Sequence, residues 1–401
     1  MIISKKSVFF ILISIFFIYI SIMLLITFLP FYLEQILGIE PAAITLSMTI
    51  IMFTLFIFPP LLGKFSDKIQ NRIYFIYLFP VGIVFSLVLL IFTKDIILLN
   101  IILFMFGFFI SFLTVYLTLF SELVQNDKKW VSYYNATCSI GNFIGVLIGG
   151  MLIDLFKIGN IFIFTLASFL IAIVFIVFIR EDRNLILESN KKEYSNFNNG
   201  KLNNPFNEER KISNSIYYSL FFRSFAIIPI LNVLVNILSP HIATTSIAFL
   251  VGLNPLLQFF FIIIIGIILN EKNIKIFLIL GYLLSTIIVI GYIFSFDFWS
   301  VFIVQIMLAS GFSMFWMATI VYIAQNSNPT NKGRFIGYAT TSTYAGTTSG
   351  GLFFSLLLTV FQGNYDLSMV FMILFPAIST IIIIFLFKIP QNKSHSTPKS
   401  V

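Results

Sequence analysis

A short charged stretch between two long apolar runs carries the first residues with evident chemistry. Residues 63–72 read Gly-Lys-Phe-Ser-Asp-Lys-Ile-Gln-Asn-Arg and separate apolar runs over 43–62 and 73–92. Glycine tolerates a tight bend, and an aspartate with cations on both sides can form an ionic contact. We therefore expect a turn led by Gly63 that works as an electrostatic latch. The alternative is a basic loop that only directs membrane insertion.

Polar side chains inside the apolar runs form the second set. Such groups are costly in lipid and therefore face the protein interior. Asn232 and Asn236 stand four residues apart, as do Asn254 and Gln258, which predicts that each pair shares a helix face. Any single member could serve only to join helices by a hydrogen bond, but the set predicts a cavity that binds a solute. The predicted cavity residues are Asn142, Asn232, Asn236, Asn254, Gln258, Trp316 and Tyr344.

The placement of charge bounds what that cavity could bind. No Asp or Glu stands in the middle of an apolar run. Proton-coupled carriers commonly bury a carboxylate with a tunable pKa, so proton coupling lacks support, although Glu34 could serve if the cavity reaches it. We expect Arg223 to extend toward the membrane surface rather than to bind an anion. The cavity is then uncharged and suits a neutral or weakly amphipathic solute; sugars and lipophilic drugs both fit.

The sequence contains few residues that could catalyse a reaction or bind a metal. The two histidines are far apart in the chain, and the single cysteine, Cys138, is expected to be a packing residue. We therefore expect no enzyme, no metal and no cofactor.

The elements that hold these residues must be membrane helices. Of the 401 residues, 59% are hydrophobic and only 10% are charged, so the bilayer is the only plausible solvent. A spanning helix needs roughly 20 apolar residues. The sequence predicts an all-α membrane protein with twelve transmembrane helices, beginning near Val8, Ala43, Ile73, Ile96, Tyr133, Gly159, Ile216, Thr245, Ile274, Phe298, Phe335 and Leu367.

The basic residues predict the orientation. If the N-terminus is cytoplasmic, the outer loops hold only Lys94 and Lys157 among the 24 lysines and arginines. Positive loops stay in the cytoplasm, so both termini are expected there, in a multi-pass plasma-membrane protein. The net charge of +8 is then explained by the basic cytoplasmic loops and by their attraction to the lipid bilayer. We expect no nucleic-acid partner.

The chain divides into two similar halves. We expect a six-helix bundle over 1–180, a polar cytoplasmic linker over 181–215, a second six-helix bundle over 216–388 and a cytoplasmic tail over 389–401. Gly145-x-x-x-Gly149-Gly150 recurs as Gly346-x-x-x-Gly350-Gly351, and two other glycine motifs recur at a nearly constant separation. A parallel repeat of this kind predicts two pseudo-symmetric bundles with the substrate between them.

These features resemble the major facilitator superfamily of secondary transporters. Gly63-x-x-x-Asp67-Lys68-x-x-x-Arg72 matches the family's signature between helices two and three, with Gln70 where the family usually has glycine. The glycines of the fifth segment are similar to the family's antiporter motif, with Val146 in place of its proline. Phe104 stands where the family often has an arginine in helix four.

The resemblance implies a role for the charged stretch. In the family this loop helps hold the outward-facing state closed on its cytoplasmic side. We expect Asp67 to dock at the N-terminus of helix eleven, whose amide groups carry partial positive charge, with Glu122 accepting from Arg72 or Lys68. Such contacts would contribute about 1–3 kcal/mol to a two-state equilibrium. The predicted latch residues are Gly63, Asp67, Lys68, Arg72, Glu122 and Arg334.

Together these features predict a secondary transporter. It would move a small neutral or amphipathic solute by alternating access, as a monomer and in the export direction. The alternative is a membrane sensor or scaffold that has the same fold but does not transport.

Overall fold

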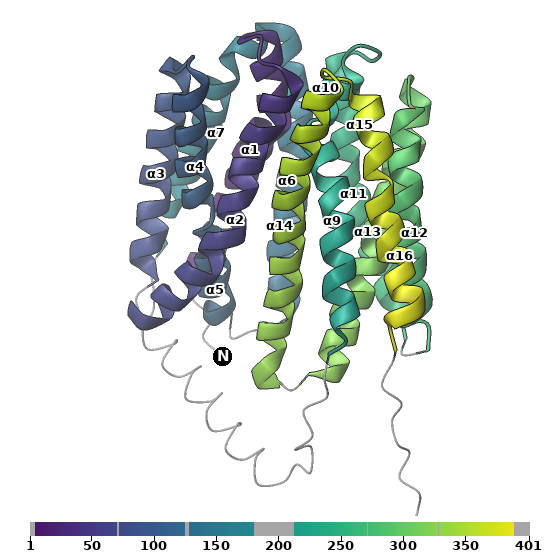
Figure 1. Cartoon of the computed structure of the whole chain (residues 1–401). Coiled ribbons are helices and arrows are strands. Elements are labelled where there is room, and N and C mark those ends of the chain that lie inside the picture. Colours follow the sequence, from purple (N-terminus) through teal and green to yellow (C-terminus); the bar gives the residue numbers. More distant parts are fainter. Residues whose placement is uncertain are drawn as a thin grey trace, which may run out of the picture.

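All regular structure described in this protein is helical. The computed structural model describes residues 5–69, 72–124, 128–179, 212–270, 272–327 and 329–388 (Figure 1). Within these residues the side chains of Asp67 and Glu122 are not described. Most of the predicted linker, 181–211, and the predicted tail, 389–401, lie outside the described residues.

The N-terminal half contributes α1 (Lys5–Gln35), α2 (Pro41–Ile69), α3 (Ile73–Phe92), α4 (Ile96–Ile110), α5 (Leu113–Leu123), α6 (Lys128–Phe156), a short 3-10 helix at Ile158–Asn160 and α7 (Ile161–Ile176). The C-terminal half contributes α9 (Asn214–Asn232), α10 (Leu234–Leu238), α11 (Thr244–Ile268), α12 (Ile274–Ile293), α13 (Phe298–Asn326), α14 (Pro329–Val360), α15 (Tyr365–Met372) and α16 (Leu374–Leu386). These elements fall where the twelve segments were predicted.

Ten described helical segments are long and apolar enough to cross a membrane. The other two predicted spans are formed by α9 with α10 and by α14. With 32 residues, α14 extends roughly 48 Å at about 1.5 Å per residue. Its middle is rich in threonine and serine, because it lies between the two halves rather than against lipid.

The charged stretch after Gly63 forms no turn. Helix α2 continues through Gly63 to Ile69, and a Cβ at Gly63 would meet nothing within 4 Å. The expectation of a glycine-led turn is therefore wrong, and the aspartate of the motif belongs to the last turns of a helix. Left-handed backbone at glycine is found instead at Gly38 and Gly363, which lie in connections between helices.

Equivalent helices pack in the same way in the two halves. In the N-terminal half α1 packs against α6 and α7, and α3 packs against α4. In the C-terminal half α9 packs against α14 and α16, and α12 packs against α13. Between the halves α2 packs along α14, and α11 packs along α6. By position within its half, α2 corresponds to α11 and α14 corresponds to α6. The pair α2–α14 is therefore equivalent to the pair α11–α6, as a two-fold axis between the bundles requires.

The repeated glycines make equivalent close contacts in the two halves. A Cβ at Gly145 of α6 would lie 2.5 Å from the carbonyl oxygen of Ile20 in α1. A Cβ at Gly346 of α14 would collide with the carbonyl of Phe221 in α9. Ile20 and Phe221 are separated along the chain by the same distance as the two glycines. Small residues thus let the first and fifth helices of each half approach closely.

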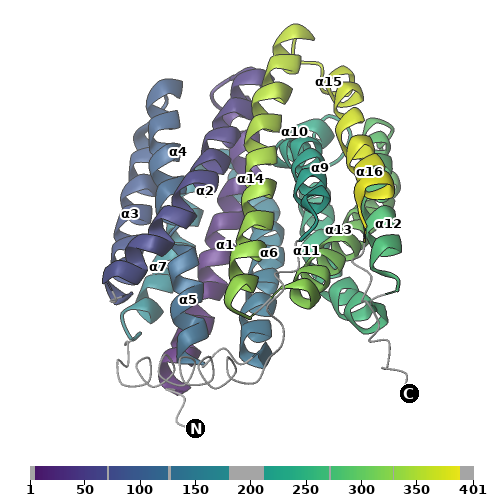
Figure 2. The same ribbon diagram turned by 60° about the horizontal axis from the view of Figure 1, so that its bottom comes forward.

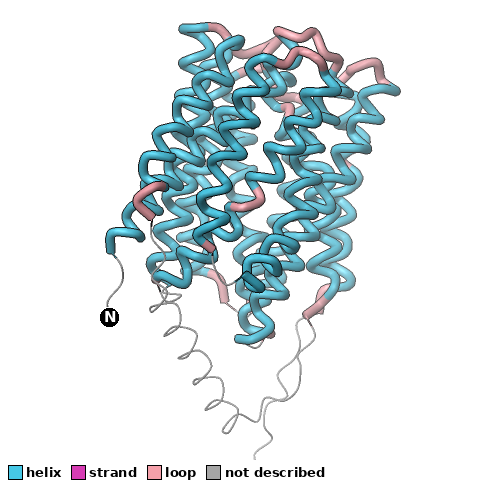
Figure 3. Tube along the Cα trace, turned by 90° about the vertical axis from the view of Figure 1, so that its left-hand side faces the viewer, coloured by secondary structure: helices cyan, strands magenta, loops and turns pink. Residues whose placement is uncertain are grey.

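The described chain begins and ends on one side of the molecule. The start of α1 and the end of α16 lie at the same end of the bundle (Figures 1 and 2), which we call the terminal end. The opposite end, where α1 finishes and α10 lies, we call the far end. Most loops lie at these two ends (Figure 3).

Candidate substrate site and gate

An amide cluster joins two helices of the C-terminal half. Asn254 of α11 donates from Nδ2 to Oε1 of Gln305 in α13 at 3.3 Å, and Gln258 donates from Nε2 to Oδ1 of Asn254. The expectation that Asn254 and Gln258 share a helix face is confirmed. Nε2 of Gln305 is buried and has no hydrogen-bond partner within the described residues. Because α11 also packs along α6, the cluster sits close to the interface between the halves.

A group of hydroxyls and a thiol occupies the N-terminal half. Tyr19 of α1 lies beside the buried thiol of Cys138 in α6 and near Tyr344 of α14. The hydroxyl of Tyr116 in α5 is hydrogen-bonded to that of Ser14 in α1. The predicted residue Tyr344 is therefore brought to a cluster of the opposite half.

Asn142 stands one helical turn beyond Cys138 on α6. Its side chain is half-buried, and its Oδ1 is sealed without a hydrogen-bond partner among the described residues. A buried acceptor without a donor is costly, and because this oxygen is sealed, it would accept from a bound molecule only after a local rearrangement exposes it. Tyr19 was absent from the predicted site. Its signal was a tyrosine within an otherwise apolar first span.

The predicted pairing of Asn232 with Asn236 fails. Helix α9 ends at Asn232, Val233 leaves helical geometry with ψ of 16°, and α10 begins at Leu234. The two amides therefore do not share the face of one continuous helix. Trp316, the remaining predicted residue, lies on α13 and stacks on Phe312 with ring centroids 6.1 Å apart.

Asn236 instead helps to close the far end. Its Nδ2 donates to Oε2 of Glu34 at 2.7 Å and to the carbonyl oxygen of Pro30 at 3.0 Å. Nearby, Ser355 of α14 donates from Oγ to the carbonyl oxygen of Ala42 at 2.7 Å. Each of these bonds joins one half to the other. We call this group the far seal.

Some positions near the terminal end of both interface helices are exposed. On α2, Thr49 and Met52 are buried, whereas Phe65 is 56% exposed. On α14, Thr347 is buried, whereas Tyr338 is 50% exposed. The terminal ends of α2 and α14 also lie apart in two views (Figures 1 and 2). The two halves are thus joined at the far end and separated toward the terminal end.

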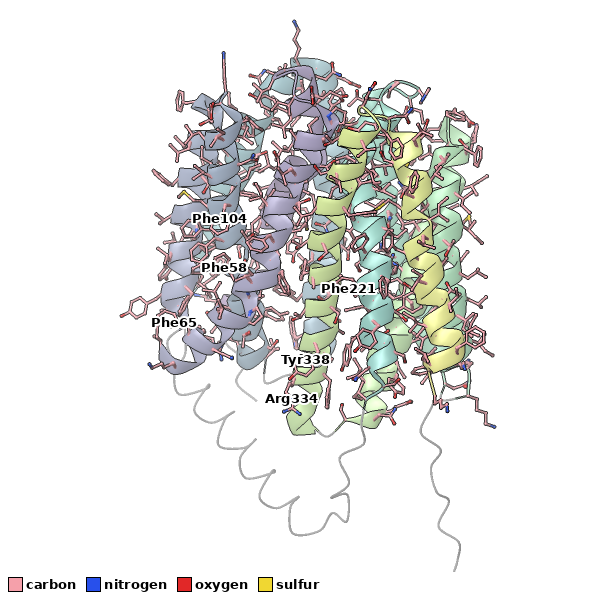
Figure 4. All side chains as sticks on the ribbon, viewed as in Figure 1. Phe58, Phe65, Phe104, Phe221, Arg334 and Tyr338 are labelled. Atoms are coloured by element: carbon pink, nitrogen blue, oxygen red, sulfur yellow. The ribbon has the colours of Figure 1, made fainter. Side chains whose placement is uncertain are left out.

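The predicted latch residues stand on this separated side. Arg72 donates from Nη1 to Ser66 at 3.3 Å within its own segment, and Lys68 is exposed. Arg334 lies 5.3 Å above the ring of its neighbour Phe335. Figure 4 places Phe65 and Arg334 well apart on α2 and α14. The structure therefore does not bring the two ends of the latch together, and Asp67 and Glu122 have no described side chains.

An aromatic residue stands at the position of the family's helix-four arginine. Phe104 of α4 contacts Phe58 of α2 edge-on, with centroids 5.7 Å apart. Figure 4 shows both rings on the N-terminal half. Phe104 and Phe58 thus form an aromatic pair at the position where the family often has an arginine.

Arg223 of α9 does not extend toward the membrane surface, so that expectation is wrong. Its side chain is only 4% exposed. Nε donates to Oγ of Ser285 in α12 at 3.0 Å, and the guanidinium lies 4.1 Å from the ring centroid of Phe315 in α13. A desolvated cation–π contact contributes about 2 kcal/mol, whereas burying an unpaired cation costs several kcal/mol. The contacts described for Arg223 offset only part of that penalty.

Comparisons with known proteins agree with this architecture. The family model for the Major Facilitator Superfamily matches residues 11–240 and again 215–400. A search of curated proteins found no match. The family model therefore matches both halves of the chain.

Solved structures of transporters share the fold. A mutant form of the nucleoside transporter NupG is 13% identical with a TM-score of 0.75, covering 95% of this chain and 100% of that one. A POT family transporter in complex with a thioalcohol-conjugated peptide is 12% identical with a TM-score of 0.75, covering 94% and 95%. A bacterial homologue of the human lysosomal transporter Spinster, inward-facing and unoccupied, is 11% identical with a TM-score of 0.71, covering 94% and 96%.

At such low identity these structures establish the fold alone. The family match covers nearly the whole chain, once over each half, and it agrees with the exchange of helix pairs between the bundles. The chain belongs to the major facilitator superfamily of membrane transporters.

Proposed function

We propose that the protein is a secondary transporter that moves a small organic solute by alternating access. The observation that carries the proposal is the one-sided interface: two pseudo-symmetric halves are sealed at the far end and separated toward the terminal end. A carrier must exchange such a state with its mirror arrangement. A rigid scaffold would have no need of an interface closed on one side only.

Uncharged polar groups support a neutral or amphipathic solute. Among the described residues, Asn142 has an unpaired acceptor and Gln305 an unpaired donor, one in each half, and both atoms are sealed until the site rearranges. Tyr344 and Gln258 add groups that can both donate and accept. Sugars and lipophilic drugs are the two classes that such a site would fit.

The distribution of basic residues supports an orientation in the plasma membrane. With both termini cytoplasmic in the plasma membrane, the terminal end would face the cytoplasm, and the structure would be inward-facing. We propose that a monomer loads its solute from that side and exports it.

Counterflow into proteoliposomes tests the proposal. Vesicles loaded with one unlabelled solute should accumulate its labelled form, across a panel of sugars, nucleosides, peptides and dyes. Nucleosides and peptides are included because the fold is shared with a nucleoside transporter and a peptide-bound transporter. We expect saturable counterflow for one class, reduced by Asn142→Leu and Tyr344→Phe and retained by the exposed control Asn270→Ala.

A sensor or scaffold is the second candidate. It is favoured by Phe104, which packs on Phe58 where transporters of this family often carry an arginine. If no solute shows counterflow while the folded protein still binds one, the sensor is supported and the transporter proposal fails.

A further inference from the structure

Arg223 is a buried cation without an acidic partner in the described part of the chain. It lies between α9, α12 and α13, where Ser285, Phe315 and Tyr282 surround it. Ser285 accepts from Nε, and no carboxylate oxygen of a described residue forms an ion pair with the guanidinium. Among the described residues, a hydroxyl and aromatic rings contact the positive charge, and no anion neutralises it.

The terminal nitrogens of the guanidinium have hydrogen-bonding capacity that the described residues do not use. Nε is the one nitrogen with a described hydrogen bond, which leaves the two terminal nitrogens unpaired within the described residues. Neither terminal nitrogen is among the fully sealed polar atoms, although the side chain as a whole is 4% exposed. The planar fork of donors thus keeps unused hydrogen-bonding capacity and a small accessible area, and a guanidinium fork can bind one carboxylate or phosphate group through two parallel hydrogen bonds.

Aromatic rings continue from this fork along α13. The guanidinium lies 5.9 Å from the ring centroid of Phe312, and Phe312 stacks on Trp316. Both residues are half-buried. An apolar body could lie against these rings while its anionic group meets Arg223.

We propose that Arg223 binds the anionic group of an amphipathic organic anion, whose apolar part packs on Phe312 and Trp316. This inference rests on the proposed transport function and narrows its substrate class: of the neutral and amphipathic solutes, it selects an amphipathic anion. A purely structural role, in which Arg223 only clamps α9 to α12 and α13, is the competing outcome.

Tryptophan fluorescence can report the site. The chain has three tryptophans, and the variant Trp130→Phe/Trp299→Phe leaves Trp316 as the only emitter. The detergent-solubilised protein is titrated with benzoate, benzenesulfonate and phenyl phosphate, and in parallel with the neutral benzamide and the cationic benzylamine. We expect saturable quenching by at least one anion and none by benzamide or benzylamine at the same concentration.

Substitution of the arginine then tests the assignment. Arg223→Gln should weaken the anion's affinity by about tenfold or more, because a charge-assisted hydrogen bond is lost. The control is the exposed Lys94→Gln, which also removes one positive charge and should leave the affinity unchanged. Arg223→Lys keeps the charge without the planar fork and should fall between the two.

Two results would overturn the proposal: no anion-selective quenching in the parent protein, or unchanged anion binding in Arg223→Gln. The first comparison needs no Arg223 variant, so it decides the matter even if Arg223→Gln does not fold. Counterflow of a neutral solute without anion-selective binding would reject this inference and leave the transport function standing. Anion-selective binding without counterflow would reject the transport function instead.

Discussion

Single hydrogen bonds decide which end of the interface is closed. Asn236 donates to the carboxylate of Glu34, and bonds of this charge-assisted kind contribute about 1.5–3 kcal/mol. An equilibrium between two conformations shifts about tenfold for each 1.4 kcal/mol. One amide can therefore change the population of the sealed state substantially, without any effect on the fold of either half.

A capping residue provides a pH-dependent contribution outside the membrane spans. Asp297 accepts hydrogen bonds from the amides of Trp299 and Ser300 at 2.8 and 3.1 Å, at the start of α13. The bonds from Ser300, together with that from Trp299, lower the pKa of the Asp297 carboxyl. Because the folded pKa is the lower one, the contribution is fully present above the unfolded pKa of about 4 and is lost as the pH falls through the folded value.

We accordingly expect Asp297→Asn to lower the thermal unfolding temperature at pH 7, because the amide caps without a charge at the helix N-terminus. The difference from wild type should shrink between pH 5 and the lowest accessible pH, in melting curves of the solubilised protein. The exposed Asp154→Asn is the control. A difference that stays constant over this range would contradict the assigned charge effect.

The candidate site could be predicted only in part at this scale. Asn254 and Gln258 were placed together because one unbroken helix carries both. Asn232 and Asn236 were predicted to share a helix face as well, but α9 stops between them, and a sequence gives little warning of such a break. Arg223 was misplaced for a different reason: its partners, Ser285 and Phe315, come from helices far along the chain, and no local pattern predicts them.

Among the elements, α14 has one glycine that packs closely against a neighbouring helix and another with open space around it. A Cβ at Gly346 would collide with the backbone of α9, whereas a Cβ at Gly337 of the same helix would meet nothing within 4 Å. The two glycines therefore provide a matched pair. One is required by packing and the other is not.

We expect Gly346→Ala to destabilise the protein by about 1–3 kcal/mol, because overpacking forces α9 and α14 apart. Gly337→Ala should be neutral or stabilising by up to about 1 kcal/mol, since alanine favours the helix. Chemical or thermal unfolding of the solubilised variants measures both. Equal effects of the two substitutions would show that close approach at Gly346 does not matter.

The latch remains a prediction about the ends of α2 and α14. These ends lie apart in the present structure, as a latch for the oppositely open state requires. Asp67→Asn should shift the resting population toward the state that is open at the terminal end, by a few fold to about a hundredfold for 1–3 kcal/mol. Accessibility labelling at the two ends measures the shift, with Lys64→Gln as the control, and no shift would leave the motif a basic loop.

Helix positions were predictable because apolar length is a strong signal. The twelve predicted starts fall at or near the described helices, whereas two features were missed: the break between α9 and α10 and the continuation of α2 through Gly63. Glycine suggested a bend there. The tertiary setting imposes none, since nothing packs against that position.

For the molecule as a whole, the repeated glycines predicted the pseudo-symmetry of the two halves, but they did not predict which end of the interface is closed. The repeat predicted that two bundles meet about an axis, and the exchange of α2–α14 with α6–α11 agrees with it. Which end is closed depends on contacts such as Asn236 with Glu34. Those contacts join residues from different halves, and two states of similar free energy can share one sequence.

The most direct test of the central claim is the distance between the terminal ends of α2 and α14 in membranes. Spin labels at Phe65→Cys and Tyr338→Cys, both exposed sites, in a Cys138→Ala background would report it by pulsed electron paramagnetic resonance. If the halves rock, Asn236→Ala weakens the far seal, and the distribution gains a shorter-distance population, while the control Asn270→Ala leaves it unchanged. A single distance that Asn236→Ala does not alter would contradict alternating access in this protein.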